Sequence, residues 1–309
     1  APLYKHGIFE KIISAENLFL AWKEFCRGKR KKSEVQQFEF NLEDNLFQLR
    51  EELLVKNYQP QPYSSFYIQD PKLRHIHKAS VRDRVLFQAV FKILYPIFDR
   101  NFIYDSYSSR VGKGTHAAVN KLECFAKKCN RNNCRTIFAL KCDIKKFFDS
   151  INHGILMDLI KNKIDDKEAI WLVTEIIKSY SKGENCGLPL GNVTSQLFAN
   201  IYLNELDQYI KNKLKLKYYL RYCDDFIILN QNHHCFGEIT KEISLFLENN
   251  LKLKLHPSKV IVRRYSEGID FLGYVLRPHY RILRTNTRKR LLRKINEKNL
   301  PSYLGILKH

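Results

Sequence analysis

Two adjacent acids, Asp224 and Asp225, stand between two apolar runs of strand-like sequence. The runs extend over residues 218–222 and 226–229, and they predict a β-hairpin with both carboxylates at its tight turn. Two like charges beside buried strands are costly unless cations compensate them, and we expect divalent metal ions to do so. Carboxylates held around two ions roughly 3.5–4 Å apart are the arrangement used for two-metal phosphoryl transfer.

A third acid, Asp143, lies near the end of another strand-like segment, residues 137–144. Alternation places Asp143 on the face opposite the apolar side chains of Phe138, Leu140, Cys142 and Ile144. Aromatic residues follow at Phe147 and Phe148, before a helix predicted over Ile155 to Ile164. The chain therefore offers three carboxylates on strand ends with aromatic rings close by.

These segments resemble, in order, the motifs of reverse transcriptases. The Asp143 strand resembles motif A, the Gly/Pro-rich turn at residues 187–196 resembles motif B, and Tyr222-Cys223-Asp224-Asp225 resembles motif C. Residues 70–74 and 82–84 resemble a fingers motif and residues 110–114 the next one. Residues 256–259 resemble motif D and residues 271–274 the primer-grip hairpin. The resemblance extends from about residue 60 to residue 290, and its collinear order carries it.

The resemblance implies an α/β (α+β) fold, the right-hand polymerase with fingers, a palm sheet carrying the Tyr-x-Asp-Asp hairpin, and a small helical thumb. It divides the chain into an N-terminal helical extension with fingers (1–134), a palm with an inserted finger portion (135–275) and a short basic thumb (276–309). The implied enzyme is an RNA-directed DNA polymerase, a nucleotidyltransferase.

The resemblance also assigns the chemistry. Asp143 and Asp224 bind two Mg²⁺ ions, with Mn²⁺ as a substitute, Asp225 supports them, and the backbone carbonyl of Ile144 is an additional ligand. The primer 3′-hydroxyl then attacks the α-phosphate of the nucleotide. Lys259 either protonates the pyrophosphate leaving group or is simply solvated, and the sequence leaves both readings open.

A second set of residues is expected around the incoming nucleotide. Lys72 and Arg74 neutralise its triphosphate. Phe148, beside Phe147, falls where the family has its steric gate against a ribose 2′-hydroxyl, the alternative being an ordinary core phenylalanine. The remaining candidates near the nucleotide or templating base are Arg110, Leu190 and Gln196.

Contacts with nucleic acid are expected at two further places. The first is Tyr222 with the primer-grip residues Phe271, Leu272, Gly273 and Tyr274. The second is the basic thumb helix, including Arg288, Lys289 and Arg290, which can clamp a duplex or bind a partner protein.

Two departures in motif B narrow the subtype. Pro189-Leu190-Gly191 stands where retroviral and group II intron enzymes carry Pro-Gln-Gly, and Ser195-Gln196 replaces Ser-Pro. Both features resemble the enzymes of bacterial and phage diversity-generating retroelements, which copy a template RNA with errors opposite adenine. The implied partners are template RNA, primer or cDNA, dNTPs and a basic accessory protein. A defence-associated or group II intron-derived reverse transcriptase is the alternative. A non-catalytic RNA-binding protein is disfavoured because all three acids are present.

Charge and composition agree with a nucleic-acid partner. The 309 residues contain 53 Lys and Arg against 32 acids, a formal charge of +21, which favours a polyanion over an anionic membrane. No apolar run approaches the ~20 residues of a membrane span and the first residues have no signal-peptide pattern, so a cytoplasmic protein is expected. Cys124, Cys129 and Cys134 lack zinc-ribbon spacing, and the eight cysteines are expected to be reduced thiols.

The remaining segments complete the expected organisation. Residues 16–55 are predicted to be helical, interrupted by the basic run 27–32, which is either a solvated loop or a grip on template phosphates. A short strand is expected over Ser65 to Gln69 and a buried helix over Val85 to Phe98. We expect template removal or target nicking to come from elsewhere.

Overall fold

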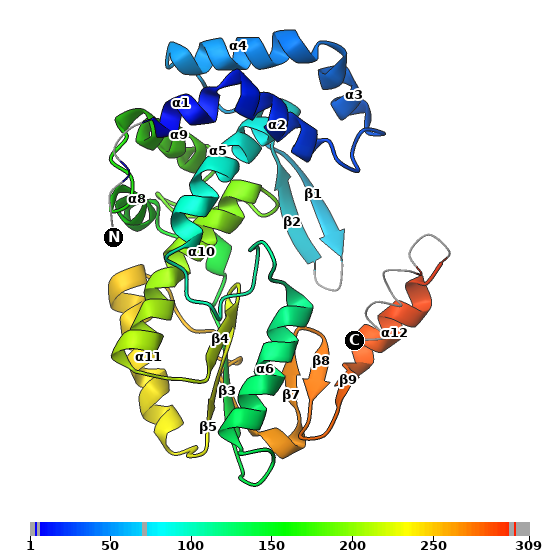
Figure 1. The fold of residues 1–309 in the computed structure, drawn as a ribbon, viewed down its shortest axis with the longest axis vertical. Coiled ribbons are helices and arrows are strands. Elements are labelled where there is room, and N and C mark those ends of the chain that lie inside the picture. The colour runs from blue at the N-terminus through cyan, green and yellow to red at the C-terminus, as the bar shows by residue number, and fades with distance from the viewer. Residues whose placement is uncertain (1–3, 5–6, 70–72, 297–299, 301–309) are drawn as a thin grey trace. The chain divides into compact units, whose positions relative to one another are not determined.

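The computed structural model describes the chain except for residues 1–3, 5–6, 70–72, 297–299 and 301–309 (Figure 1). The chain forms two compact units, each assembled from segments that are distant in sequence. The first unit contains residues 1–102, 146–205 and 251–253, and the second contains 103–145, 206–250 and 254–309. The predicted boundaries after residues 134 and 275 divide the chain by polymerase function, and that division stays a prediction.

The first unit is mainly helical. Its N-terminal part contains α1 (Ile8–Ile13), α2 (Ala15–Phe25), α3 (Ser33–Phe40) and α4 (Leu42–Leu54), with the basic run in the turn between α2 and α3. Ser14 caps α2 because its hydroxyl accepts from the Asn17 amide at 3.2 Å. Buried Leu18, Trp22 and Phe25 recur at helical spacing. The predicted helical segment and its interruption are confirmed.

A two-stranded ladder and a long helix follow in the same unit. Strands β1 (Ser64–Gln69) and β2 (Leu73–Lys78) pair antiparallel, and α5 (Val81–Asp99) starts after the cap residue Ser80. The fully buried Asp83 accepts hydrogen bonds from the Tyr58 hydroxyl at 2.9 Å and the Gln61 amide at 2.8 Å, which ties the connecting loop to the helix. The predicted strand and buried helix are therefore confirmed.

The first unit continues after residue 145 with α7 (Phe147–Ser150), α8 (His153–Lys161), α9 (Lys167–Lys178) and α10 (Val193–Gln208). Asp166 joins two of its helices. One carboxylate oxygen caps α9 at the amides of Glu168 and Ala169, and the other accepts from the α1 amides of Ile8 and Phe9. Helix α10 ends in the second unit, where it continues as the π-helical turn η1 (Tyr209–Lys213).

The second unit is organised around an antiparallel sheet with strand order β4-β5-β3-β6. Its strands are β3 (Phe138–Asp143), β4 (Tyr219–Tyr222), β5 (Asp225–Asn230) and β6 (Ile261–Arg264). Helix α6 (Thr115–Cys129) packs Val119, Leu122 and Ala126 into a core with the sheet residues Ala139 and Ile227. This packing fixes the strands that carry the predicted carboxylates.

A smaller sheet and three helical segments complete the second unit. The sheet contains β7 (Ile269–Phe271), β8 (Tyr274–Leu276) and β9 (Arg281–Leu283), and the helical segments are α11 (Cys235–Leu251), the 3₁₀ turn η2 (Tyr265–Glu267) and α12 (Thr285–Lys294). Within the described residues, no helix has the length and apolar character needed to cross a bilayer. All eight cysteines are free.

Candidate active site

The predicted hairpin is present in the second unit. Strands β4 and β5 pair so that Tyr222 faces Asp225, and Cys223 and Asp224 form the turn between them. Cys223 holds a left-handed φ of 56°, a conformation that residues with a Cβ rarely adopt. The turn therefore places Asp224 at its tip and Asp225 at the first position of a buried strand.

Strand register brings the third acid to the same place. Strand β3 pairs antiparallel with β5, and its last residue, Asp143, is the cross-strand partner of Asp225. Like charges directly opposite one another destabilise a sheet unless something balances them. The sequence-based expectation that Asp143 joins the hairpin acids is thus realised by one pairing of two strands.

Lys259 balances the first of these acids. Its ammonium group lies 2.8 Å from Asp143 Oδ1, and the His256 amide donates to the Asp143 carbonyl at 2.8 Å. The segment predicted to be motif D is therefore bound to the end of β3 by both its backbone and its side chain. The Lys259 side chain keeps 37 % of its surface exposed, so it is accessible to a substrate.

Lys141 balances the second acid and was missed in the sequence. Its Nζ lies 3.2 Å from Asp225 Oδ2 and donates to the Asp270 carbonyl at 3.0 Å. Lys141 precedes Asp143 by two positions on β3, so the period of a strand puts both side chains on one face. That alternation was the available signal.

Burial and mutual repulsion perturb the hairpin acids. Burial raises the pKa of Asp224, and the charge of Asp143 raises it further. Burial raises the pKa of Asp225 to about 6, with Lys141 opposing the rise and Asp143 and Asp224 adding to it. A perturbed cluster of this kind is typical of sites where charge is used in catalysis.

A buried ion pair supports the hairpin turn from within. Arg221 is fully buried, and its guanidinium donates to both carboxylate oxygens of Asp207, at 2.8 and 2.6 Å. It also donates to the Cys223 carbonyl at 3.0 Å and to the Ser106 hydroxyl at 3.2 Å. Burial alone would lower the pKa of Arg221, but Asp207 outweighs it and raises that pKa. The signal in the sequence was an arginine inside an otherwise apolar strand.

The carboxylate oxygens of the three aspartates are chemically suited to bind a divalent cation. Carboxylates are hard ligands suited to Mg²⁺, and Asp225 Oδ1 is buried with no hydrogen-bond partner among the described residues. Lys259 and Lys141 occupy one oxygen of Asp143 and one of Asp225. In the described part of the chain, no three His, Cys, Asp or Glu side chains are already arranged as a metal centre. Ile144, whose carbonyl is the predicted additional ligand, donates its amide to the Asp224 carbonyl at 3.2 Å.

The residues predicted to contact the nucleotide lie mostly in the first unit. Phe147 is buried, and half-buried Phe148 packs edge-on against it with ring centroids 5.4 Å apart. The Leu188 amide donates to the Phe148 carbonyl at 2.8 Å, which fixes the predicted motif B loop to α7. In that loop Leu190 is half-buried, and Gln196 is exposed on the first turns of α10.

Of the cations predicted near the incoming nucleotide, the structure describes Arg74 and Arg110. Arg74 is exposed on β2, opposite Ile68, and Lys72 lies outside the described residues. Arg110 belongs to the second unit, and its guanidinium donates to the carbonyls of Ile103 and Ser106 at 2.7 and 3.1 Å. Its contacts thus stabilise the loop that contains it.

The predicted primer-grip segment forms the β7–β8 hairpin. Its turn consists of Leu272 and Gly273, both with positive φ, at 50° and 89°, as a tight two-residue hairpin requires. Phe271 and Tyr274 point into the core, so the half-buried Leu272 and Gly273 form the accessible tip. Tyr222 is half-buried, and its hydroxyl oxygen lies 3.3 Å from the hydroxyl oxygen of Thr115.

The predicted thumb helix is α12, Thr285–Lys294. Arg288 and Lys289 are exposed, Arg290 is half-buried, and Leu291 is buried. This helix therefore presents cations on one side and buries a leucine on another.

Comparison with known proteins identifies the family of this chain. The chain matches the family "Reverse transcriptase (RNA-dependent DNA polymerase)" over residues 68–276. The match covers more than half of the chain, and the protein belongs to this family. The prediction of an RNA-directed DNA polymerase is confirmed at this level.

Curated relatives include a group II intron-encoded protein. The chain is 28% identical to Protein YkfC of Escherichia coli K12, over 74% of this chain and 70% of that protein. It is 26% identical to the group II intron-encoded protein LtrA of Lactococcus lactis subsp. cremoris, over 80% of this chain and 51% of LtrA. It is also 24% identical to a putative COX1/OXI3 intron 2 protein of Saccharomyces cerevisiae, and it spans 30% of that protein. The chain thus spans about half or less of two of these three relatives.

A solved structure shares the fold. Apo telomerase from Candida tropicalis, truncated from its C-terminal domain, superposes with a TM-score of 0.54 at 14% identity, over 77% of this chain and 59% of that one. The predicted mixed α/β class agrees with this likeness.

Proposed function

We propose that this protein extends a primer on a template RNA, adding deoxynucleotides to make cDNA by nucleotidyl transfer. The observation that carries the proposal is the strand register that sets Asp143 opposite Asp225, next to Asp224 at the hairpin tip. Three carboxylates from two paired strands are an arrangement that suits phosphoryl transfer at divalent cations.

The cation proposed here is Mg²⁺, two ions in number, with Mn²⁺ as a substitute. Asp143 and Asp224 would hold both ions, and Asp225 and the Ile144 carbonyl would complete the oxygen ligands. Bound cations would supply charge neutralisation at the transferred phosphate and a lower pKa at the attacking hydroxyl. The unpartnered Asp225 Oδ1 and the raised pKa values of Asp224 and Asp225 support this assignment, because burial and the neighbouring acids disfavour the charged carboxylates and a bound cation would offset that cost.

The two lysines have different proposed roles. Lys259 has an accessible ammonium group beside Asp143, so it can donate a proton to the pyrophosphate leaving group. Lys141 binds Asp225 and the Asp270 carbonyl, and therefore positions the carboxylate at the start of β5. Only Lys259 is proposed to touch the substrate.

The first unit supplies the proposed nucleotide contacts. Phe148 would exclude a ribose 2′-hydroxyl by contact with its ring, and Arg74, with Lys72, would neutralise the triphosphate. Leu190 and Gln196 would lie near the nascent base pair. The bonded backbone of Leu188 and Phe148 supports a common role for the motif B loop and the aromatic pair.

The nucleic acid itself would be bound by cations and hairpins of the second unit. The exposed Arg288 and Lys289 of α12 can neutralise backbone phosphates of an RNA·DNA duplex. The tip of the β7–β8 hairpin, Leu272 and Gly273, is the proposed contact with the primer strand.

The test is primer extension on a defined RNA template with Mg²⁺. Asp224→Asn removes the charge of a ligand while keeping its size, and synthesis should fall by at least about 1,000-fold, or roughly 4 kcal/mol. RNA binding and thermal stability should be retained. Asp158→Asn, at an exposed acid of α8, is the matched control and should extend at the parental rate. Normal extension by the Asp224 variant would exclude the hairpin as the catalytic centre.

A finer assignment concerns the kind of reverse transcriptase. We propose the error-prone enzyme of a diversity-generating retroelement, acting with a basic accessory protein and making errors opposite template adenine. Leu190 in place of a glutamine supports it, because an aliphatic side chain offers the nascent pair no hydrogen bond.

A group II intron-type reverse transcriptase is the second candidate, and the intron-encoded names among the curated relatives favour it. The RNA that copurifies with the protein from its native host distinguishes the two. A repeat-derived template RNA supports the retroelement enzyme, whereas an intron RNA supports the second candidate. A defence-associated enzyme would instead be encoded in an antiphage gene cluster.

A further inference from the structure

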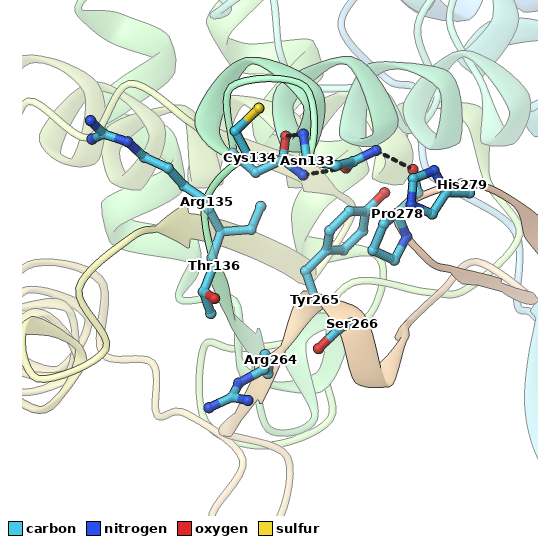
Figure 2. Close-up of a pocket in the computed structure, with 11 residues that line it drawn as sticks. Asn133, Cys134, Arg135, Thr136, Arg264, Tyr265, Ser266, Pro278 and His279 are labelled. Carbon is cyan, nitrogen blue, oxygen red and sulfur yellow. Dashed lines mark hydrogen bonds between the residues drawn. The ribbon is translucent and has the colours of Figure 1, made fainter.

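A polar pocket of about 240 Å³ lies in the second unit (Figure 2). It is formed by the loop between α6 and β3, the corner between β6 and η2, and the turn between β8 and β9. Thr136 and Ile137 of its wall precede β3, and Asp143 ends that strand. At about 3.3 Å per residue, the pocket is roughly 20 Å from the carboxylates. It is therefore a different place from the site that would hold a reacting triphosphate.

The charge of this pocket has one sign. Arg135, Arg264 and His279 line it, and its lining in the described part of the chain includes neither Asp nor Glu. The other polar side chains that line it are hydroxyls, amides and a thiol. A pocket with two guanidinium groups and no carboxylate favours an anion.

The wall of the pocket is already built. Asn133 donates to the Pro278 carbonyl at 3.1 Å and exchanges hydrogen bonds with Asn130 at 2.6 and 2.8 Å (Figure 2). The buried Tyr265 donates its hydroxyl to the Arg277 carbonyl at 3.0 Å. These groups join the three segments to one another. A ligand would therefore be bound by other donors of the pocket.

The loop also holds an uncommon backbone. Arg131, Asn132 and Asn133 have successive positive φ angles of 50°, 53° and 71°. Each such residue costs on the order of 1 kcal/mol and persists only where its surroundings impose it, which is common at binding sites.

Several donors in this pocket have no partner. Among the described residues, the side chains of Arg264, His279, Thr136 and Ser266 make no hydrogen bond or ion pair. The Arg264 guanidinium is 5.7 Å from the centroid of the Phe138 ring, which holds it without using its N–H groups. Arg135 donates to Gln231 at 3.0 Å with one nitrogen and keeps other donors.

We propose that this pocket binds a phosphate group of an RNA backbone, with Arg264 as the principal contact. Guanidinium groups match phosphate oxygens in a bidentate geometry. The volume is below the roughly 300–1,000 Å³ of pockets that enclose a drug-sized ligand, so it suits a phosphate with part of its sugar. The choice of RNA as the molecule that carries the phosphate rests on the proposed function. The preference of the pocket for a phosphate group does not depend on it.

The experiment compares two neighbouring arginines of β6. Arg263 and Arg264 are both exposed and equally charged, but only Arg264 lines the pocket. Binding of a labelled 20-nucleotide RNA is measured by fluorescence anisotropy over a salt series, without nucleotides or Mg²⁺, so that no synthesis is needed. Arg264→Gln should reduce the slope of log affinity against log salt by about 0.7, and Arg263→Gln should leave it unchanged. Equal slopes for the two variants would overturn RNA as the ligand.

A second readout uses the parent protein and needs no substitution. Cys134 is exposed on the pocket wall, and Cys235 lies elsewhere on α11. RNA should slow alkylation of Cys134 several-fold and leave Cys235 unchanged, as read by peptide mass. Protection by adenosine monophosphate but not by RNA would support the phosphate site with a free nucleotide as its source. If neither RNA nor adenosine monophosphate protects Cys134, the proposed phosphate site is overturned. If RNA protects Cys134 but the protein makes no cDNA, the phosphate site is upheld and the proposed function is not.

Discussion

Arg221 donates a 3.0 Å hydrogen bond from Nη1 to the carbonyl oxygen of Cys223, so a fully buried guanidinium holds the first residue of the hairpin turn. The Ile144 amide holds the second residue by donating to the Asp224 carbonyl at 3.2 Å. Left-handed turn residues such as Cys223 persist only where neighbouring groups fix them. The position of Asp224 thus depends on a buried guanidinium and on a backbone amide of the neighbouring segment.

The first prediction separates this positioning role from stability. Arg221→Met alone leaves the buried Asp207 carboxylate without its countercharge, with a hydrogen bond from the Tyr219 hydroxyl at 2.6 Å, and should cost about 3–5 kcal/mol of unfolding free energy. The double variant Arg221→Met/Asp207→Asn removes both charges, keeps an acceptor for the buried Tyr219 hydroxyl, and should recover most of that loss in urea unfolding. Its primer extension should nevertheless stay at least about tenfold below the parent, because the Cys223 carbonyl has lost its donor. Parental kcat in the double variant would reduce Arg221 to a residue of the fold.

The second prediction concerns pH. The folded protein holds the pKa of Asp225 at about 6, above the ordinary value of 3.8, so between these values the folded state binds more protons than the unfolded state. Asp225 should therefore lower stability as pH rises from about 4 to 6, by at most about 3 kcal/mol.

The measurement is the unfolding free energy of the parent and of Asp225→Asn across that range, without divalent cations. The unfolding free energy of the variant should increase relative to that of the parent as pH rises. Mg²⁺ should restore the stability of the parent. Asp44→Asn, at an exposed acid of α4, is the control and should show no such gain. A difference between parent and Asp225→Asn that is independent of pH would contradict the perturbed pKa.

The sequence could predict the carboxylates because their signals are local. Alternation placed Asp143 on a strand face, and two acids between apolar runs located the hairpin. Local sequence patterns do not show which side chains pair when the residues are distant in the sequence. Neither the pairing of Lys141 with Asp225 nor the Arg221–Asp207 ion pair follows from neighbouring residues, since the first depends on strand register and the second on where α10 ends. Nor did the sequence show that the rings of Phe271 and Tyr274, which are expected near nucleic acid, lie in the core of the second unit.

The third prediction tests Lys259 as a proton donor. Lys259→Gln keeps a polar chain beside Asp143 but removes the proton, so kcat should fall about 100-fold, as loss of a general acid does. The KM for the nucleotide should change little. Lys259→Arg retains a cation near Asp143 and should keep the fold and the cation affinity but transfer a proton poorly. Equal kcat for the parent and Lys259→Gln would make Lys259 a solvated partner of Asp143 only.

The fourth prediction tests Phe148 as the steric gate. Phe148→Ala removes the half-buried ring, so the ratio of kcat/KM for deoxynucleotides over ribonucleotides should fall at least about tenfold, or roughly 1.4 kcal/mol. Phe148→Tyr keeps the ring and should keep the ratio. If the alanine variant discriminates as the parent does, Phe148 belongs to the core alone with Phe147.

The fifth prediction is that Leu190 relaxes fidelity opposite adenine. Leu190 is half-buried in a loop that the Leu188 amide fixes to the Phe148 carbonyl, and Gly191 supplies the left-handed φ of 110° that the loop requires. Substitution at residue 190 should therefore change the side chain and leave the loop in place. An amide at this position can hydrogen-bond beside the nascent pair, and about 1.4 kcal/mol of added discrimination is a tenfold lower error rate. Leu190→Gln should thus copy adenine more accurately, even if synthesis slows.

Leu190→Met matches glutamine in length without its amide and should keep the parental error rate. Deep sequencing of cDNA from a template containing all four bases measures both variants. A parent that copies adenine as accurately as the other bases, with and without a basic accessory protein, would rule out the diversity-generating assignment.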